Sequence, residues 1–167
     1  MDQLLSVIQL NVMRALVTNM AAIGYSWDLF TDANGVIADD AISPFIDPSN
    51  MVALSSPQHL RPTRLQTVAA HQPWIDLWPF PQMRDNILRQ GEDFDDTPLC
   101  LDMVESYCGP DGMSGLLVWG DPWDPNSWEA TEAFAKKWGW IMTGCFDLFK
   151  STNFWRAKRG EKKLFPV

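Results

Sequence analysis

The sequence contains few of the residues that covalent chemistry usually needs. It has three cysteines and two histidines among 167 residues. Cys100, Cys108 and Cys145 are odd in number and fit no disulfide framework or compact zinc spacing, so we expect an intracellular, reducing environment and no bound metal. Two weaker alternatives remain open. One is a metal site of both histidines with Cys100 and Cys108, and the other is a nucleophilic pair of Cys145 with His71, which requires contact in space.

Long hydrophobic runs and excess positive charge are also missing. Gln9, Asn11 and Arg14 interrupt the apolar N-terminal segment, so we expect neither a signal peptide nor a transmembrane helix, and hence a soluble protein without membrane contact. Lys and Arg number 13 against 21 Asp and Glu, which gives a net charge of −8. Phosphate contacts need a basic surface, so this chain is not expected to bind nucleic acid directly. Residues 85–111 are acidic and the residues from 150 onward basic, which favours pairing between them over a localisation signal.

Aromatic residues, by contrast, are abundant: nine Trp and nine Phe stand against two Tyr. Six of the tryptophans lie within residues 115–160, so this stretch is expected to organise the core. It opens with the apolar run 116–119, typical of a buried extended segment, and two prolines in residues 120–125 exclude regular structure. Apolar residues then recur at spacings of three and four, which predicts one long central helix over residues 128–150.

The remaining sequence predicts shorter helices and one long irregular segment. Helices are expected at residues 3–23, 62–70, 82–90, 97–107 and 151–159. Residues 25–62 lose periodicity and carry turn signals, so we expect them to wrap the core, with a role as a lid or partner surface. The predicted fold is mainly α: a single-domain helical bundle over residues 1–167, built around the long Trp-rich C-terminal helix and joined by irregular Pro-rich connections.

Catalytic patterns are weak. Asp121 and Asp124 flank Trp123, a composition found at sugar sites where paired carboxylates work beside an aromatic platform. Asp-Pro pairs are also ordinary turn and cap chemistry, which is the preferred interpretation here. The glycines of residues 109–115 follow no strand and lack the lysine of a phosphate-binding loop. We therefore expect no enzyme, no catalytic residue and no cofactor, and keep an enzyme using Asp121 and Asp124 as an alternative.

The tryptophans also suggest a ligand-binding hypothesis. Packing in the core is their preferred role, but several could line an apolar pocket into which a few polar groups converge. The candidate ligand-binding residues are Asn11, Arg14, His71, Trp74, Asp76, Trp119, Trp123, Trp138 and Trp155.

Ordered sequence pieces over nearly the whole chain carry a family resemblance. They are 8–16 (IQLNVMRAL), 62–66 (PTRLQ), 71–76 (HQPWID), 79–86 (PFPQMRDN), 99–102 (LCLD), 118–125 (VWGDPWDP), 128–129 (WE), 137–140 (KWGW) and 151–156 (STNFWR). On these pieces the sequence resembles the uncharacterised conserved domain found C-terminal to the basic leucine zipper (bZIP) in many fungal transcription factors.

The resemblance implies a regulatory domain of a nuclear protein, with no established reaction or ligand. Such a domain would tune transcription through protein contacts, self-association or a bound small molecule. No stretch of this sequence combines clustered Arg and Lys with leucine heptads. The chain is therefore expected to be either a domain of a longer protein, whose separate bZIP region binds DNA, or a stand-alone relative to which DNA binding does not apply. The leading functional hypothesis is thus a non-enzymatic effector domain, and the alternative is a ligand-binding pocket domain.

Overall fold

The computed structural model describes residues 2–31, 41–47, 55–91, 93–105, 108–109 and 112–167. Its helices and strands are, in chain order, α1 (Asp2–Ala22), η1 (Trp27–Leu29), η2 (Pro44–Ile46), η3 (Gln58–Leu60), η4 (Pro73–Leu77), α3 (Pro81–Leu88), α4 (Thr97–Glu105), β1 (Cys108–Gly109), β2 (Gly112–Met113), β3 (Leu116–Val118), η5 (Pro125–Ser127), β4 (Trp128–Ala130), α5 (Glu132–Trp138) and α6 (Phe146–Lys158). The mainly α prediction is confirmed in this coarse form. Within the described residues, no helix is long and apolar enough to cross a membrane.

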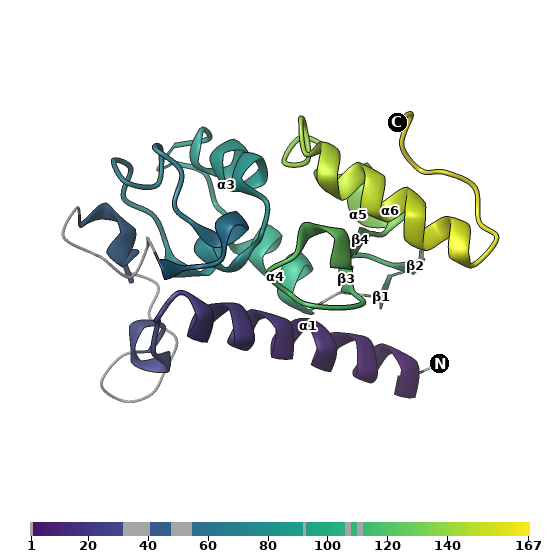
Figure 1. Ribbon diagram of the computed structural model, residues 1–167, viewed down its shortest axis with the longest axis horizontal. Coiled ribbons are helices and arrows are strands. Elements are labelled where there is room, and N and C mark those ends of the chain that lie inside the picture. Colours follow the sequence, from purple (N-terminus) through teal and green to yellow (C-terminus); the bar gives the residue numbers. More distant parts are fainter. Residues whose placement is uncertain (1, 32–40, 48–54, 92, 106–107, 110–111) are drawn as a thin grey trace.

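A short β-ribbon separates the two longest helices. Strands β3 and β4 pair antiparallel, with Leu116 opposite Ala130 and Val118 opposite Trp128. Helix α1 contacts β3 and helix α6 contacts β4, so the ribbon lies between them (Figure 1). The extended segment predicted at residues 116–119 is therefore confirmed as β3 with the residue that follows it.

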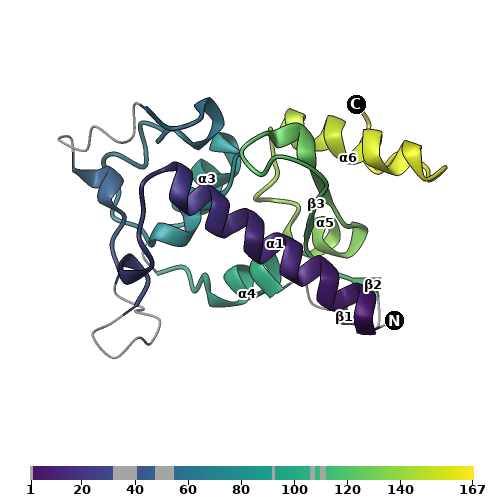
Figure 2. The same ribbon diagram turned by 60° about the horizontal axis from the view of Figure 1, so that its bottom comes forward.

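Helix α1 agrees closely with the helix predicted at residues 3–23. Its polypeptide turns away at Gly24, which has φ +73°, a conformation that glycine adopts without steric cost. The amide of Tyr25 then donates to the carbonyl of Met20 at 3.0 Å and satisfies one of the free carbonyls at the helix end. In Figure 2 this helix runs across the front of the molecule, over α4 and β3.

The prediction of one long Trp-rich helix over residues 128–150 is wrong. Residues 128–130 form β4, α5 follows, and α6 starts only at Phe146 and continues through the helix predicted at residues 151–159. The reason is local: the Thr131 hydroxyl accepts from the amide of Phe134 at 3.2 Å and starts α5 afresh, and Gly144, at φ +79°, lies in the turn before α6. Most apolar side chains of this stretch still enter the core, but from β4, α5, the turn between α5 and α6, and α6 itself.

Three other predicted helices can be compared with the chain from residue 55 to 105. The helix expected at residues 62–70 is also wrong, since these residues form consecutive turns. Its proposed start is nevertheless present, because the Thr63 hydroxyl accepts from the Gln66 amide at 3.2 Å while the Gln66 side chain accepts from the Thr63 amide at 3.0 Å. The helices expected at residues 82–90 and 97–107 correspond to α3 and α4, and residues 106–107 of the second lie outside the described residues. Of the irregular segment 25–62, residues 32–40 and 48–54 lie outside the described residues.

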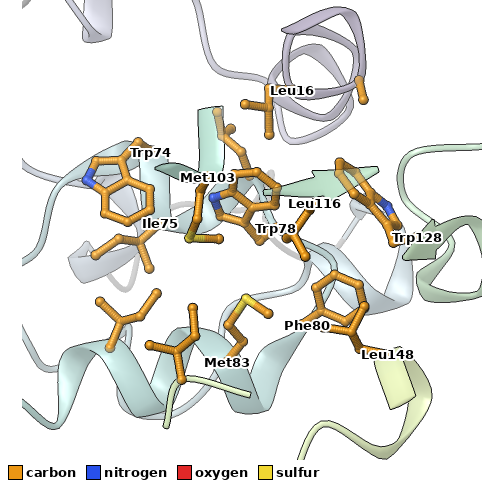
Figure 3. Close-up of a cluster of buried hydrophobic side chains, with 14 of the residues drawn as sticks. Leu16, Trp74, Ile75, Trp78, Phe80, Met83, Met103, Leu116, Trp128 and Leu148 are labelled. Atoms are coloured by element: carbon orange, nitrogen blue, oxygen red, sulfur yellow. The ribbon is translucent and has the colours of Figure 1, made fainter. Parts of the chain in front are cut away.

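The centre of the core is aromatic. Trp78 and Trp128 are fully buried, and their rings meet edge to face with centroids 5.4 Å apart. Leu16 of α1 and Leu148 of α6 approach the same cluster from opposite sides (Figure 3). Burying one such large apolar side chain stabilises the fold by about 1.5–3 kcal/mol. This cluster therefore contributes strongly to holding α1, the β3–β4 ribbon and α6 together.

A single buried asparagine fastens three segments together beside this core. The side-chain amide of Asn19 on α1 donates to the carbonyl of Leu77 at 2.9 Å and to that of Pro122 at 3.0 Å. The Pro122 carbonyl also accepts from the indole of Trp128 at 2.9 Å. Helix α1, η4 and the Pro-rich loop between β3 and β4 are thus held in one arrangement.

Replacing Asn19 by alanine should destabilise the protein by about 2 kcal/mol, since a buried carbonyl left without a donor costs about 1–3 kcal/mol. Urea unfolding at 25 °C measures this free energy. Asn11→Ala is the matched control, because Asn11 is exposed on the same helix, and it should change stability by less than about 0.5 kcal/mol. Equal effects of the two substitutions would contradict the fastening role of Asn19.

Candidate functional site

The most concentrated group of polar side chains surrounds Asp76 in η4, whose carboxylate is fully buried. Its Oδ2 accepts from the Tyr25 hydroxyl at 2.7 Å and from the Ser43 hydroxyl at 2.6 Å. Its Oδ1 accepts from the Gln66 side-chain amide and from Nε2 of His71, the latter at 2.8 Å. The four donors come from four separate segments, and together they use the lone pairs that a carboxylate offers.

Two cations compensate this buried charge. Nδ1 of His71 lies 2.7 Å from the Ala69 carbonyl and Nε2 lies 2.8 Å from Asp76, and both partners can only accept, so we assign a proton to each ring nitrogen. Burial lowers the pKa of His71, but the hydrogen bonds to Asp76 and Ala69 and the Asp76 charge together raise it above its ordinary value. The guanidinium of Arg84 donates to the carbonyls of Arg61 at 2.8 Å and Asp76 at 3.4 Å.

Burial has two further electrostatic effects in this network. It lowers the pKa of Arg84 to about 10, which leaves the side chain charged at neutral pH. It also raises the pKa of Tyr25 above its ordinary value, and the charge of Asp76 adds to this shift, so Tyr25 stays a hydrogen-bond donor. Asp76 and His71 therefore bind each other and stabilise the fold, and the four hydrogen bonds leave no carboxylate lone pair for a ligand.

The other residues proposed for one aromatic pocket are spread over separate places. Asn11, Arg14 and Trp119 line one cleft between α1 and the loop after β3, with a volume of about 310 Å³. Trp119 stacks on Trp155 with ring centroids 5.5 Å apart. Trp138 lies elsewhere, where its indole donates to Asp102 at 2.7 Å. The structure therefore does not bring these tryptophans together around one cavity.

Trp119 and Trp155 belong instead to a ladder on the outside of α6. The ammonium of Lys158 lies 4.7 Å from the centroid of Trp155, and the guanidinium of Arg159 lies 5.5 Å from that of Trp119. Arg159 also forms a bidentate pair with the buried Glu129, at 2.5 and 2.8 Å. The ion pairs that the structure describes for the basic tail thus go to Glu129 and Glu161, not to the acidic segment 85–111 as predicted.

Trp74 lines an apolar cleft that was not predicted from the sequence. The cleft holds about 240 Å³ between α1, η1, η4 and α4. Its walls include side chains that remain substantially exposed: Trp27 at 52%, Leu101 at 48% and Val17 at 45%. The available signal was a second apolar face on α1, where Leu10, Met13 and Val17 follow one another at spacings of three and four, separate from the face that enters the core. Trp123, the last of the proposed residues, is exposed at the surface.

Of the residues kept as catalytic alternatives, Asp124 and Cys145 make structural contacts, and Asp121 is exposed at the surface. Asp124 accepts from the amide of Asn126 at 2.9 Å and so caps η5, as turn chemistry predicted. Burial raises the pKa of the Cys145 thiol to about 12, and its hydrogen bond goes to the Ile141 carbonyl, not to His71. Across the part of the chain that the structure describes, no group of three or more His, Cys, Asp or Glu side chains could hold a metal ion.

The sequence was compared with known protein families, curated proteins and solved structures. The model of the family described as Domain of unknown function (DUF3425) matches residues 40–148. The chain belongs to this family. No curated protein and no solved structure matches it. The DUF3425 match includes Ser43, Gln66, His71, Asp76 and Arg84, whereas Tyr25 and α1 lie outside it.

The charge of His71 predicts how the stability of this DUF3425 chain depends on pH. A pKa that is raised by folding contributes stability that is complete below the unfolded value of 6.5 and that is lost as the pH rises through the folded value. The advantage of the wild type over His71→Gln, measured by urea unfolding from about pH 5.5 to about pH 9, should therefore be largest at the acidic end.

His59→Gln is the control for this experiment, because His59 is the other histidine of the chain and lies outside the Asp76 network. A wild-type advantage over His71→Gln that is constant with pH, or that grows toward high pH, would contradict a charged His71.

Proposed function

We propose that this chain is a non-enzymatic regulatory domain that binds an apolar helix of a partner protein in the cleft between α1 and α4. The cleft itself carries the proposal. Contiguous exposed apolar side chains are uncommon on a soluble domain without a binding role. Here Met13, Val17 and Leu101 stay partly exposed next to Trp27, on helices whose other faces enter the core.

The shape of the cleft favours a helical partner. Side chains of α1 and α4 line it together with Trp74 and Leu77 of η4, which are largely buried. An amphipathic helix binds such a groove through apolar side chains at spacings of three and four, and an aromatic side chain supplies large contact area at low conformational cost.

The distribution of polar groups supports binding over catalysis. Asp76, His71 and Arg84 hold the fold together, and Asp124 caps a turn. The cleft is lined mainly by apolar side chains, with Gln72 and the thiol of Cys100 among them, and the lining residues that the structure describes include no Asp, Glu, His, Lys or Arg, so it offers a partner contact area but no paired acid and base.

The resemblance to the domain that follows the basic leucine zipper in fungal transcription factors supports placing this binding in transcription regulation in the nucleus. In such a protein the bZIP region would contact DNA, and this chain, with its net charge of −8, would recruit or restrain a partner protein.

A reporter assay tests this function. The whole chain is fused to a heterologous DNA-binding domain upstream of a reporter gene, and output is compared with that of the DNA-binding domain alone. The chain should change output several-fold, and Val17→Arg combined with Leu101→Arg should abolish the change, because two charges in the cleft would have to be desolvated on binding.

Phe154→Arg is the matched control, since Phe154 of α6 is 52% exposed and does not line the cleft. Circular dichroism and protein level establish that each variant is folded. A fused chain that leaves the reporter unchanged, or cleft and control variants with the same effect, would refute the proposal.

A further inference from the structure

A second cavity lies on the other side of η4 from the apolar cleft. Trp74 and Leu77 line the cleft, whereas Ile75, between them in sequence, lines this cavity. Its volume is about 640 Å³, which lies within the range of about 300–1,000 Å³ that small-molecule sites occupy. It belongs to the end of the molecule that holds α3, away from α6 (Figure 1).

The walls of this cavity combine apolar and polar groups. Ile75 and Ile87, each 3% exposed, line it together with the half-buried Leu88 and Phe94, and His71, Gln72 and Asp96 add polar atoms. The ring of Phe94 packs edge to face against Trp140 with centroids 5.5 Å apart, which fixes that wall. A rigid apolar body seated here would gain hydrophobic contact on several sides.

Two ionisable side chains line the cavity, and only one of them lacks charge compensation. His71 is bound to Asp76 at 2.8 Å, so the pair is neutral overall. Asp96 is half-buried, and no Lys, Arg or His among the described residues forms an ion pair with it. Burial raises the pKa of Asp96 above its usual range, the nearby Trp74 indole opposes this shift, and the neighbouring charge of Asp95 adds to it.

The electrostatics therefore select the sign of a ligand. A carboxylate partly shielded from water and without a cation is stabilised by any positive charge brought beside it, and it repels an anion. Asp93 and Asp95 precede it on the exposed chain and extend the negative field around this side of the cavity.

We propose that this cavity binds a small organic cation with an apolar body: an ammonium group beside Asp96 and a ring or branched chain against Ile75, Ile87 and Phe94. The site shares Gln72 with the cleft but uses a different chemistry. It does not rest on the proposed protein partner, so either could be right without the other.

Three matched probes test the proposal on the whole chain. They are 1-naphthylmethylamine, 1-naphthalenemethanol and 1-naphthoic acid, which share one ring system and are cationic, neutral and anionic at neutral pH. Isothermal titration calorimetry should find the amine bound at least tenfold more tightly than the alcohol, and the acid more weakly than either. Amide chemical shifts should change around Ile75, Ile87 and Phe94.

Variants of Asp96 separate charge from shape. Asp96→Asn should lower the affinity for the amine at least tenfold, to that of the alcohol, while Asp96→Glu should restore most of it. Asp121→Asn is the control, because Asp121 is an exposed acid that does not line the cavity, and it should leave binding unchanged. Equal affinity for amine and alcohol, no binding of the amine, equal losses in Asp96→Asn and Asp121→Asn, or shift changes confined to the α1–α4 cleft would each overturn the proposal.

Discussion

The buried carboxylate of Asp76 is the constraint on which the irregular half of this structure depends. A charge without access to water is tolerated only when hydrogen bonds and opposite charges replace its hydration. Here the replacements come from Tyr25 after α1, Ser43 before η2, Gln66 in a turn and His71 before η4. These segments have little regular secondary structure of their own. The hydrogen bonds to one carboxylate therefore hold them in place where helix or sheet hydrogen bonds do not.

The fold thus separates two uses of its side chains. Buried polar groups hold segments together: Asp76 and Asn19 in the interior, and Glu129 beneath the ladder on α6. The two concave surfaces proposed for binding lie on either side of η4, and the first is mainly apolar whereas the second is mixed. Because η4 carries both Asp76 and the side chains that line the two concavities, the network that holds it in place also holds the binding surfaces in shape. This arrangement is the structural basis of the proposed binding role.

Sequence patterns predicted the elements whose causes are local. Helix α1 has a long periodic face and a glycine at its end, and α3 and α4 begin at Pro81 and Thr97–Pro98, so short-range signals sufficed. The prediction of a long C-terminal helix was wrong because spacings of three and four also arise where a strand, two helices and the turn between them face one core. The pairing of Trp128 with Val118 in the β-ribbon outweighs the helical periodicity. His71 and Asp76 were identified as candidates, but the role of Asp76 depends on Tyr25, 51 residues away, and on Ser43, 33 residues away, which no local pattern reveals.

Hydrogen exchange of Asp76→Asn tests the central role of this carboxylate most directly. Removing its charge takes the carboxylate from the buried His71 and part of the charge compensation from the buried Arg84, a change expected to cost about 3–5 kcal/mol locally. Exchange should accelerate in residues 41–47 and 63–75, while β3, β4 and α6 keep more of their protection. Asp147→Asn, at an exposed site, is the matched control. Protection in residues 41–47 and 63–75 that equals that of the wild type, or that falls no more than in α6, would contradict the account.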